Sequence, residues 1–251
     1  MRGSHAQNCG CFPTGHHYPG IEDSLAAVEK NVEGLVREFD PAAPWVSMPF
    51  CVIDFETTGR FAETDRVVEV GIVCFENGEC TERHNWLVNP TIPVPKEAEA
   101  VHGISDADLA DAPKWEEIQE EVIKQLSNRL VVAYNASFDR GFLFAEVART
   151  GQTDFNHIPA LRQNVQWIDP LVWARELFKY QKGKKLTDMA QRLNIPLENA
   201  HRASGDAEAA GRVLLAMAPK LPESYGELIR LQVQYAARQE MEFASWRARR
   251  R

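Results

Sequence analysis

The sequence predicts an α/β domain with a mixed central sheet flanked by helices, and two observations lead to this prediction. Strand-like segments first follow one another as a meander between residues 50 and 88, and only then alternate with helical segments. The length of 251 residues gives room for one good-sized domain with extensions, or for two small ones.

The N-terminal segment 1–44 is expected to form a disordered tail, one helix and a linker. Residues 1–20 are rich in Gly, Pro and His and show no period. Apolar residues then recur at helical spacing from Ile21 to Phe39, and the segment Pro41–Pro44 ends this helix.

The first strand begins at Phe50 and is apolar and partly β-branched until Asp54 and Glu56 interrupt it. Side chains two positions apart on a strand point to the same face, so the two acids lie side by side at the end of a core strand. An ionised carboxylate is costly to remove from water unless it is paired, hydrogen-bonded or bound to a metal. The pair therefore predicts a site for a hard divalent cation such as Mg²⁺. The alternative is that the strand frays early and both acids are solvated.

The later elements follow from periodicity, turn residues and helix-start signals. In chain order we expect strands over 66–75 and 79–88 with a tight turn at Asn77-Gly78, helices over 96–101 and 114–128, a strand over 130–133, a helix capped near Ser137 and continuing to Gly151, a strand over 165–168, helices from 171, over 186–193 and over 204–218, and a C-terminal helix from about 223.

Composition limits the expected partners and location. No run approaches the roughly 18 apolar residues of a transmembrane helix, and the N-terminus lacks the apolar stretch of a secretory signal. Five cysteines, three of them in or beside predicted strands, fit reduced core thiols, so we expect a cytoplasmic protein without a membrane partner. The net charge of −8 argues against a large phosphate-binding face, but not against a small acidic pocket that reaches phosphate through metal ions.

Two further acids occur at the starts of predicted helices, and a histidine accompanies the second. Asp139 lies just past the short strand that ends at Asn135, and Asp206 opens the helix that follows His201. Favourable interaction with the helix dipole explains either acid by itself. It does not explain His201, five residues before Asp206, although a lone loop histidine is most often solvated.

Taken together, these residues resemble the DEDDh family of 3′–5′ exonucleases, which includes the proofreading epsilon subunit of bacterial DNA polymerase III and ribonuclease T. The ordered motifs are Asp54-x-Glu56, Asn135-x-x-x-Asp139 and His201-x-x-x-x-Asp206. The Val-His-Gly-Ile segment at 101–104 agrees with this resemblance, which runs from about Phe50 to Ala218. The histidine at 201 separates this branch from the sister group, which carries tyrosine in that role.

The resemblance implies a ribonuclease H-like fold and phosphodiester hydrolysis with two divalent cations, Mg²⁺ or Mn²⁺. Two ions about 3.5–4 Å apart make a nucleophile from water, relieve charge on the phosphate and help the leaving oxygen. By resemblance, Asp54 bridges the ions, Glu56 and Asp206 complete one site, and Asp139 holds the other through water. His201 acts as general base, and its unperturbed pKa of about 6.5 suits that role.

The resemblance also places the terminal nucleotide of a substrate against the turn after the first strand and against the His-Gly-Ile loop. The residues implied are Thr57, Thr58, His102, Ile104, Asn135 and Phe138. For Phe138, plain core packing is an equal alternative. The basic loop over 179–185 is interpreted as solvated, with contact to backbone phosphates as the alternative.

The sequence is therefore interpreted as a metal-dependent exonuclease that releases mononucleotides from single-stranded DNA 3′ ends. We expect the catalytic domain over 45–220, between the N-terminal segment 1–44 and a C-terminal helical extension over 221–251. Binding of a polymerase or another protein through the terminal helices is left open. One alternative is an exoribonuclease that trims RNA 3′ ends, because the sequence does not show a pocket that excludes the 2′-OH. Another is a non-catalytic nucleic-acid-binding subunit, against which the intact acids and His201 argue.

Overall fold

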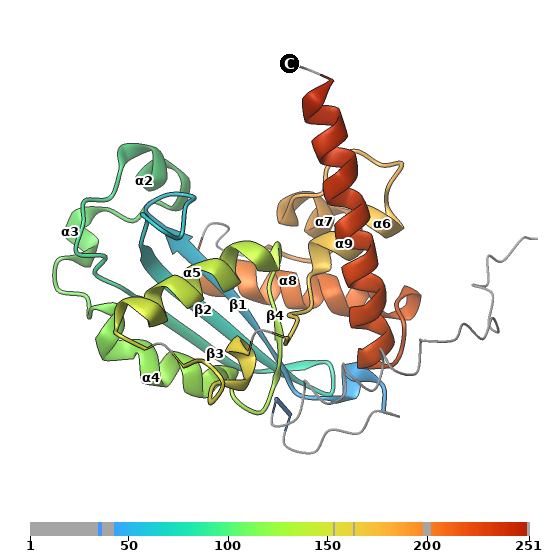
Figure 1. Cartoon of the computed structure of the whole chain (residues 1–251), viewed down its shortest axis with the longest axis horizontal. Coiled ribbons are helices and arrows are strands. Elements are labelled where there is room, and N and C mark those ends of the chain that lie inside the picture. Colours follow the sequence, from blue (N-terminus) through green and yellow to red (C-terminus); the bar gives the residue numbers. More distant parts are fainter. Residues whose placement is uncertain (1–34, 37–42, 153, 163, 198–201, 250–251) are drawn as a thin grey trace, which may run out of the picture.

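A four-stranded mixed sheet in the order β3-β2-β1-β4 forms the centre of the computed structural model (Figure 1). β1 pairs antiparallel with β2 and parallel with β4, and β2 pairs antiparallel with β3. The strands are β1 (Phe50–Thr57), β2 (Val67–Glu76), β3 (Glu79–Leu87) and β4 (Leu130–Val132). The predicted mixed sheet flanked by helices is confirmed.

The structure describes residues 35–36, 43–152, 154–162, 164–197 and 202–249. The predicted N-terminal tail, most of the predicted helix over 21–39, and His201 lie outside these described residues. Leu35 and Val36 are buried in the core. They lie in a turn and a bridge, so the helix prediction is wrong at these two positions.

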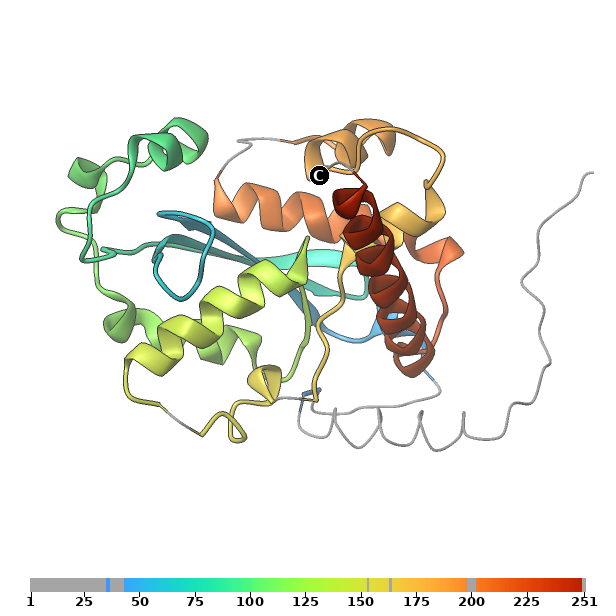
Figure 2. The same ribbon diagram turned by 45° about the horizontal axis from the view of Figure 1, so that its top comes forward.

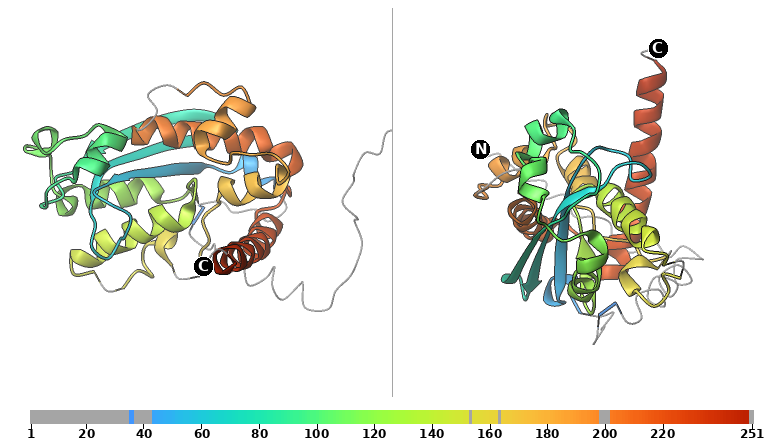
Figure 3. Two further views of the ribbon diagram at one scale, coloured as in Figure 1. Left: turned by 90° about the horizontal axis from the view of Figure 1, so that it is seen from above. Right: turned by 90° about the vertical axis from the view of Figure 1, so that its left-hand side faces the viewer.

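The central strands are buried because helices cover both faces of the sheet. Every residue of β2 except the last is buried, as expected for an apolar run sandwiched between two layers. α8 (Ala203–Met217) lies on one face, and α4 (Trp115–Leu126) and α5 (Ala136–Arg149) lie on the other (Figures 2 and 3). The sheet is therefore the middle layer of three.

Two glycines allow α8 to approach the sheet closely. A Cβ atom at Gly71 of β2 would lie 2.2 Å from backbone atoms of Ala203 and Ser204. A Cβ atom at Gly211 of α8 would lie 2.5 Å from the ring of Phe75. Because real Cβ contacts of that length do not occur, these glycines set the position of α8 and of the acid in its first turn.

α5 begins directly after β4, at a junction that a distant carboxylate stabilises. Asn135 precedes the helix with a φ of 76°, a left-handed conformation that Asn tolerates better than most residues. Asp169 accepts hydrogen bonds from the backbone nitrogens of Asn135 (3.0 Å) and Ala136 (3.1 Å). The N-terminal cap is therefore Asn135, near Ser137 as predicted, and Asp169 rather than a side chain of the cap residue accepts the hydrogen bonds.

The predicted strand over 165–168 is wrong, since only Ile168 forms an isolated parallel bridge, with Val132. Side chains of the C-terminal helix α9 (Tyr225–Ala248) bind backbone carbonyls in this segment. The Tyr225 hydroxyl donates to the Gln166 carbonyl (2.9 Å), and Gln232 donates to the Trp167 carbonyl (2.8 Å). These bonds replace those of a strand ladder.

The remaining helices agree with the predictions, except that one short helix was not predicted. That helix is α3, which a capping box between Ser105 and Asp108 initiates. The remaining helices are α2 (Lys96–His102), α3 (Asp106–Leu109), α6 (Pro170–Leu177) and α7 (Leu186–Arg192), with 3₁₀ turns η1 (Trp45–Ser47), η2 (Pro159–Leu161) and η3 (Ala218–Lys220).

α9 packs against α6 along much of its length, and only its C-terminal end projects beyond the rest of the molecule (Figure 1). Gln232 accepts from the Asp169 backbone nitrogen (2.8 Å), and Gln239 donates to the Val172 carbonyl (3.0 Å). Within the described ranges, neither α9 nor any other helix is long and apolar enough to cross a membrane.

Candidate active site

Three carboxylates meet at the end of β1. Asp54 and Glu56 point to the same face of this strand, and Asp206 reaches them from the first turn of α8. Oxygen atoms of the three side chains all lie within 4.8 Å of one another. The structure thus brings together the three acids that were expected to share one metal site.

Asp139, the fourth predicted acid, is buried in the first turn of α5 beside this cluster. Its Oδ1 atom accepts a hydrogen bond from the backbone nitrogen of Phe55 (3.0 Å), the residue between Asp54 and Glu56. Asp139 is also the foremost of the neighbouring charges that act on Asp54. All four predicted carboxylates therefore belong to one electrostatic unit, which we call the acid cluster.

The acids of this cluster oppose one another's ionisation. Burial, followed by the charges of Asp139, Asp206, Glu56 and Glu69, raises the pKa of Asp54 well above its usual range. Burial and then Asp206 and Glu69 raise the pKa of Glu56 to about 8, against a weaker opposing effect of Arg202. Burial also raises the pKa of Asp139, although the hydrogen bond from Phe55 opposes it. A divalent cation would relieve this repulsion, so these oxygen donors on rigid elements fit such an ion.

Glu69 of β2 lies opposite Glu56 in the sheet and is fully buried, but it is neutralised. Arg202 donates to its carboxylate at 2.6 Å, the backbone nitrogen of Ala203 at 3.0 Å, and Asn85 at 2.9 Å. Burial raises the pKa of Glu69, but these bonds outweigh burial and lower it overall. Glu69 thus anchors the start of α8. The sequence analysis missed it, although an acid within the apolar run 67–73 was a signal.

His102 and Ile104 lie together at the end of α2, and both are buried. Nδ1 of His102 accepts a hydrogen bond from the Ile104 backbone nitrogen (3.1 Å), which places the proton of a neutral ring on Nε2. Nε2 is buried without a hydrogen-bond partner among the described residues. Burial lowers the pKa of His102, against the opposing effects of a backbone group of Thr57 and of Glu69, and a lowered pKa favours the neutral ring.

Thr57 and Thr58, at the end of β1, are buried and use their hydroxyls locally. The Thr57 hydroxyl donates to the Gly59 carbonyl (2.6 Å), and the Thr58 hydroxyl accepts from the Arg66 backbone nitrogen (2.9 Å). Both bonds fold the turn after β1 into one arrangement.

Asn135 and Phe138 lie at the β4–α5 junction. The side chain of Asn135 is exposed, whereas Phe138 is half-buried against the core, with its ring centroid 4.8 Å from that of Phe142. Phe138 thus contributes to core packing while keeping part of its surface accessible.

The sheet order and the acid cluster at the end of β1 are those of a ribonuclease H-like nuclease domain. The chain belongs to the RNase_T exonuclease family, whose model, described as "Exonuclease", matches residues 51–214. This membership confirms the resemblance to 3′–5′ exonucleases that the ordered motifs predicted.

Two bacterial relatives illustrate this membership. The chain is 32% identical over 173 residues to "3'-5' exonuclease DinG" of Bacillus subtilis, covering 68% of this chain and 18% of the relative. It is 35% identical over 168 residues to "DNA polymerase III PolC-type" of Bacillus cereus, covering 67% of this chain and 11% of the relative. The chain therefore matches less than a fifth of the length of either protein.

Solved structures share the fold. "Exonuclease X in complex with 5' overhanging duplex DNA" matches with a TM-score of 0.57 and 23% identity, over 73% of this chain and 99% of that one. The nuclease domain of 3'hExo, "a DEDDh family member, bound to rAMP", matches with a TM-score of 0.58 and 17% identity, over 74% of this chain and 97% of that one. At these identities the matches show the ribonuclease H-like fold.

Proposed function

We propose that this protein is a metal-dependent 3′–5′ exonuclease that hydrolyses single-stranded DNA ends to mononucleotides. The observation that carries this proposal is the acid cluster, in which the strongest charges acting on Asp54 from the described residues are those of other acids. Membership of an exonuclease family supports the reaction. Its relatives, a 3′–5′ exonuclease and a DNA polymerase III of the PolC type, support DNA as the substrate.

Asp54, Glu56 and Asp206 would hold one divalent cation, Mg²⁺ or Mn²⁺, and Asp54 with Asp139 would hold a second through water. Bound cations would supply the water nucleophile and relieve charge on the phosphate and the leaving oxygen. The protein holds these acids in place. β1 positions Asp54 and Glu56, and the close packing of α8 on the sheet, which Gly71 and Gly211 allow, positions Asp206.

We assign the general base to His201, which directly precedes Arg202, the partner of the buried Glu69. Its structure lies outside the described residues, so the assignment rests on the spacing to Asp206 and on family membership. A histidine with an ordinary pKa takes a proton from water near neutral pH.

The terminal nucleotide would lie between two groups of residues on either side of the acid cluster. On one side, Nε2 of His102 donates a hydrogen bond to the sugar or phosphate, and Ile104 offers an apolar contact beside the turn of Thr57 and Thr58. On the other side, the exposed amide of Asn135 and the accessible part of Phe138 complete the pocket.

Trimming of RNA 3′ ends is the second candidate. Among proteins with this fold are a 3′-exonuclease with "recognition of histone mRNA stem-loop" and a DEDDh nuclease "bound to rAMP". The alternative of a non-catalytic binding subunit has less support. The acids of the cluster repel one another, and a protein that binds no metal ion would gain nothing to offset this unfavourable interaction.

We further propose that residues 45–220 form the catalytic domain, with 1–44 and 221–251 as extensions. The family match ends at residue 214, before α9 begins. Trp45 bonds to the carbonyls of Glu223 and Pro222, which ties the start of the domain to the segment before α9. Because one of the relatives is a DNA polymerase, a polymerase is the first partner to test for binding to these extensions.

Hydrolysis of end-labelled oligonucleotides tests the proposal. Linear single-stranded DNA should be shortened from its 3′ end to mononucleotides in Mg²⁺ or Mn²⁺ and remain intact in EDTA. A 3′-phosphate should block the reaction, and circular single strands should resist it. Comparing DNA with RNA of the same sequence separates the two candidates, and cleavage of circles would refute an exonuclease.

A further inference from the structure

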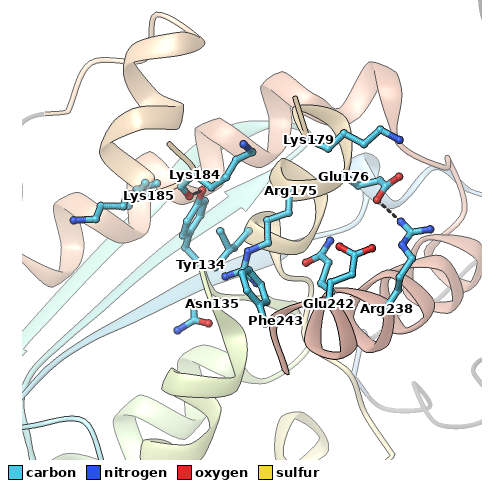
Figure 4. Close-up of a pocket in the computed structure, with 13 residues that line it drawn as sticks. Tyr134, Asn135, Arg175, Glu176, Lys179, Lys184, Lys185, Arg238, Glu242 and Phe243 are labelled. Carbon is cyan, nitrogen blue, oxygen red and sulfur yellow. Dashed lines mark hydrogen bonds and ion pairs between the residues drawn. The ribbon is translucent and has the colours of Figure 1, made fainter. Parts of the chain in front are cut away.

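A groove lies between α6, the 179–185 loop and α9, on the side of the molecule away from α2 (Figures 1 and 4). Its cavity has a volume of about 940 Å³. Five cations and two acids line this α6–α9 groove, in a chain whose net charge is −8. They are Arg175, Lys179, Lys184, Lys185 and Arg238, with Glu176 and Glu242. The groove is thus a local basic site on an acidic protein.

Most of this positive charge is available to a ligand. Arg238 forms an ion pair with Glu176, but the other four cations form none with a carboxylate within the described ranges. Burial and then the charges of Arg192 and Arg175 lower the pKa of Lys184, with Asp188 opposing. A polyanion that binds in the groove would relieve the repulsion among these cations.

The groove also offers groups that contact bases and sugars. Phe243 of α9 is 44% exposed, and the guanidinium of Arg175 lies 5.0 Å from its ring centroid. Gln239 of α9 is 93% buried, yet its Oε1 atom has no hydrogen-bond partner among the described residues. An aromatic face interleaved with cations is typical of single-strand sites, where bases stack without sequence preference.

The groove continues toward the acid cluster. Asn135, Arg175, Gln239 and Phe243 also line a second cavity of about 440 Å³, which reaches the first turn of α5 at Ala136 and Ser137. Asp139 of the acid cluster lies in the same turn. A strand whose 3′ nucleotide lies beside α2 would therefore leave the acid cluster past Asn135 and enter the groove (Figure 4).

We propose that the α6–α9 groove binds the phosphodiester backbone of single-stranded nucleic acid on the 5′ side of the cleaved bond. The C-terminal extension thereby lengthens the substrate site beyond the family domain. This inference rests on the proposed exonuclease function for its direction along the strand. Its binding component can be measured without hydrolysis.

The test compares Lys179→Ala/Lys185→Ala with a matched control, Lys114→Ala/Lys124→Ala at the two ends of α4. Anisotropy of a labelled oligothymidylate of about 15 nucleotides, in EDTA against NaCl concentration, measures binding. Removing two phosphate contacts should lower the slope of log K against log salt by about 1.4. It should weaken binding on the order of tenfold at low salt.

Kinetics with two substrates supply the second readout. KM for the oligonucleotide should rise with the loss of affinity, whereas hydrolysis of thymidine 5′-monophosphate p-nitrophenyl ester, which has no upstream strand, should not change. Phe243→Ala should weaken oligonucleotide binding without changing the salt slope, because a stacking contact releases no counterion.

The outcomes separate this inference from the proposed function. A wild-type protein that hydrolyses nothing, but binds the oligonucleotide more tightly than the groove variant does, would refute the function and support the groove. If the wild-type protein hydrolyses both substrates, but the groove variant has the same salt slope and KM as the control variant, the proposal that the groove binds the strand would be overturned and the proposed function would stand. Equal KM effects on both substrates would also overturn it, since the lysines would then act at the acid cluster.

Discussion

Buried and half-buried carboxylates occur in two kinds of surroundings in this protein. Glu69, Glu146 and Asp169 stabilise the scaffold, and each has compensating donors. Glu146, for example, pairs with Arg66 at 2.9 Å and accepts from the Val67 backbone nitrogen at 3.0 Å. In the acid cluster, by contrast, the strongest charges that act on Asp54 from the described residues are those of further acids. The chain supplies hydrogen-bond donors to the acids that it uses for structure and leaves the charge of the acid cluster to be neutralised by a ligand.

Substitution of Asp54 should give the largest effect on turnover. Asp54→Asn should lower hydrolysis by more than roughly 10³-fold, because removing even one preorganised electrostatic group usually costs 10²–10³-fold. The same variant should melt at a higher temperature than wild type in EDTA, since it removes like-charge repulsion. Asp206→Ala should behave in the same way. Wild-type turnover in either folded variant would contradict the metal assignment.

His201 should affect proton transfer and leave metal binding intact. His201→Ala should reduce kcat by roughly 10²–10⁴-fold, the usual contribution of a general base. KM should change much less, and the acid limb of the pH–rate profile should lose its histidine component. Mn²⁺ titration of the variant should still show binding, because the four carboxylates remain. A variant with the wild-type rate and pH profile would show that His201 is a solvated loop residue without a role in catalysis.

Substitution of a scaffold acid should affect stability and spare catalysis. Glu146→Gln should lower the free energy of unfolding by about 3 kcal/mol, the lower end for breaking a buried pair. The matched control is Glu208→Gln, whose partners Arg83 and Arg212 are about half exposed, and which should cost about 1 kcal/mol or less. Urea denaturation measures both. Loss of kcat with unchanged stability in Glu146→Gln would place this residue with the acid cluster.

Acids inside and outside the acid cluster should also respond to pH with opposite signs. Glu56 has a pKa raised from 4.5 to about 8, so the native state holds more protons than the unfolded state in this window. Metal-free stability should therefore fall as pH rises from about 4.5 to 8, and Mg²⁺ should reverse this loss.

Glu208 shows the opposite case, because its hydrogen bond with Arg83 lowers its pKa from 4.5 to about 2. Its contribution is present above about pH 4.5 and is lost as pH falls toward 2. Thermal melts across pH 3–9, with EDTA and with Mg²⁺, measure the change in stability at both the acidic and the alkaline end of this range. A metal-free melting temperature that rises between pH 5 and 8 would contradict the repulsion within the acid cluster.

Local pattern determined much of the fold and part of the site. β1 and its two acids were predictable because alternation along a strand is a local property that depends on only a few neighbours. The hairpin at Asn77-Gly78 and the apolar face of α4 were predictable for the same reason. The ordered motifs then indicated which distant acids belong with Asp54.

Contacts between distant segments were decided only in the folded chain. The bond between Glu69 and Arg202 joins residues 133 positions apart, and no local pattern predicts such a pair. Asp169 bonds to the start of α5, 34 positions earlier in the chain, as well as to that of α6. The predicted strand at 165–168 failed because α9, more than 50 residues later, takes its carbonyls.

The sequence by itself thus determined which residue types occur at which spacing, including the acids of the candidate site. Tertiary structure alone decided which of these charges are compensated. Desolvation and Coulomb interaction depend on distances in space, and those distances are set by packing contacts such as the seat of α8 on Gly71. For this reason Glu56 and Glu69, opposite each other on neighbouring strands, have pKa values shifted in opposite directions.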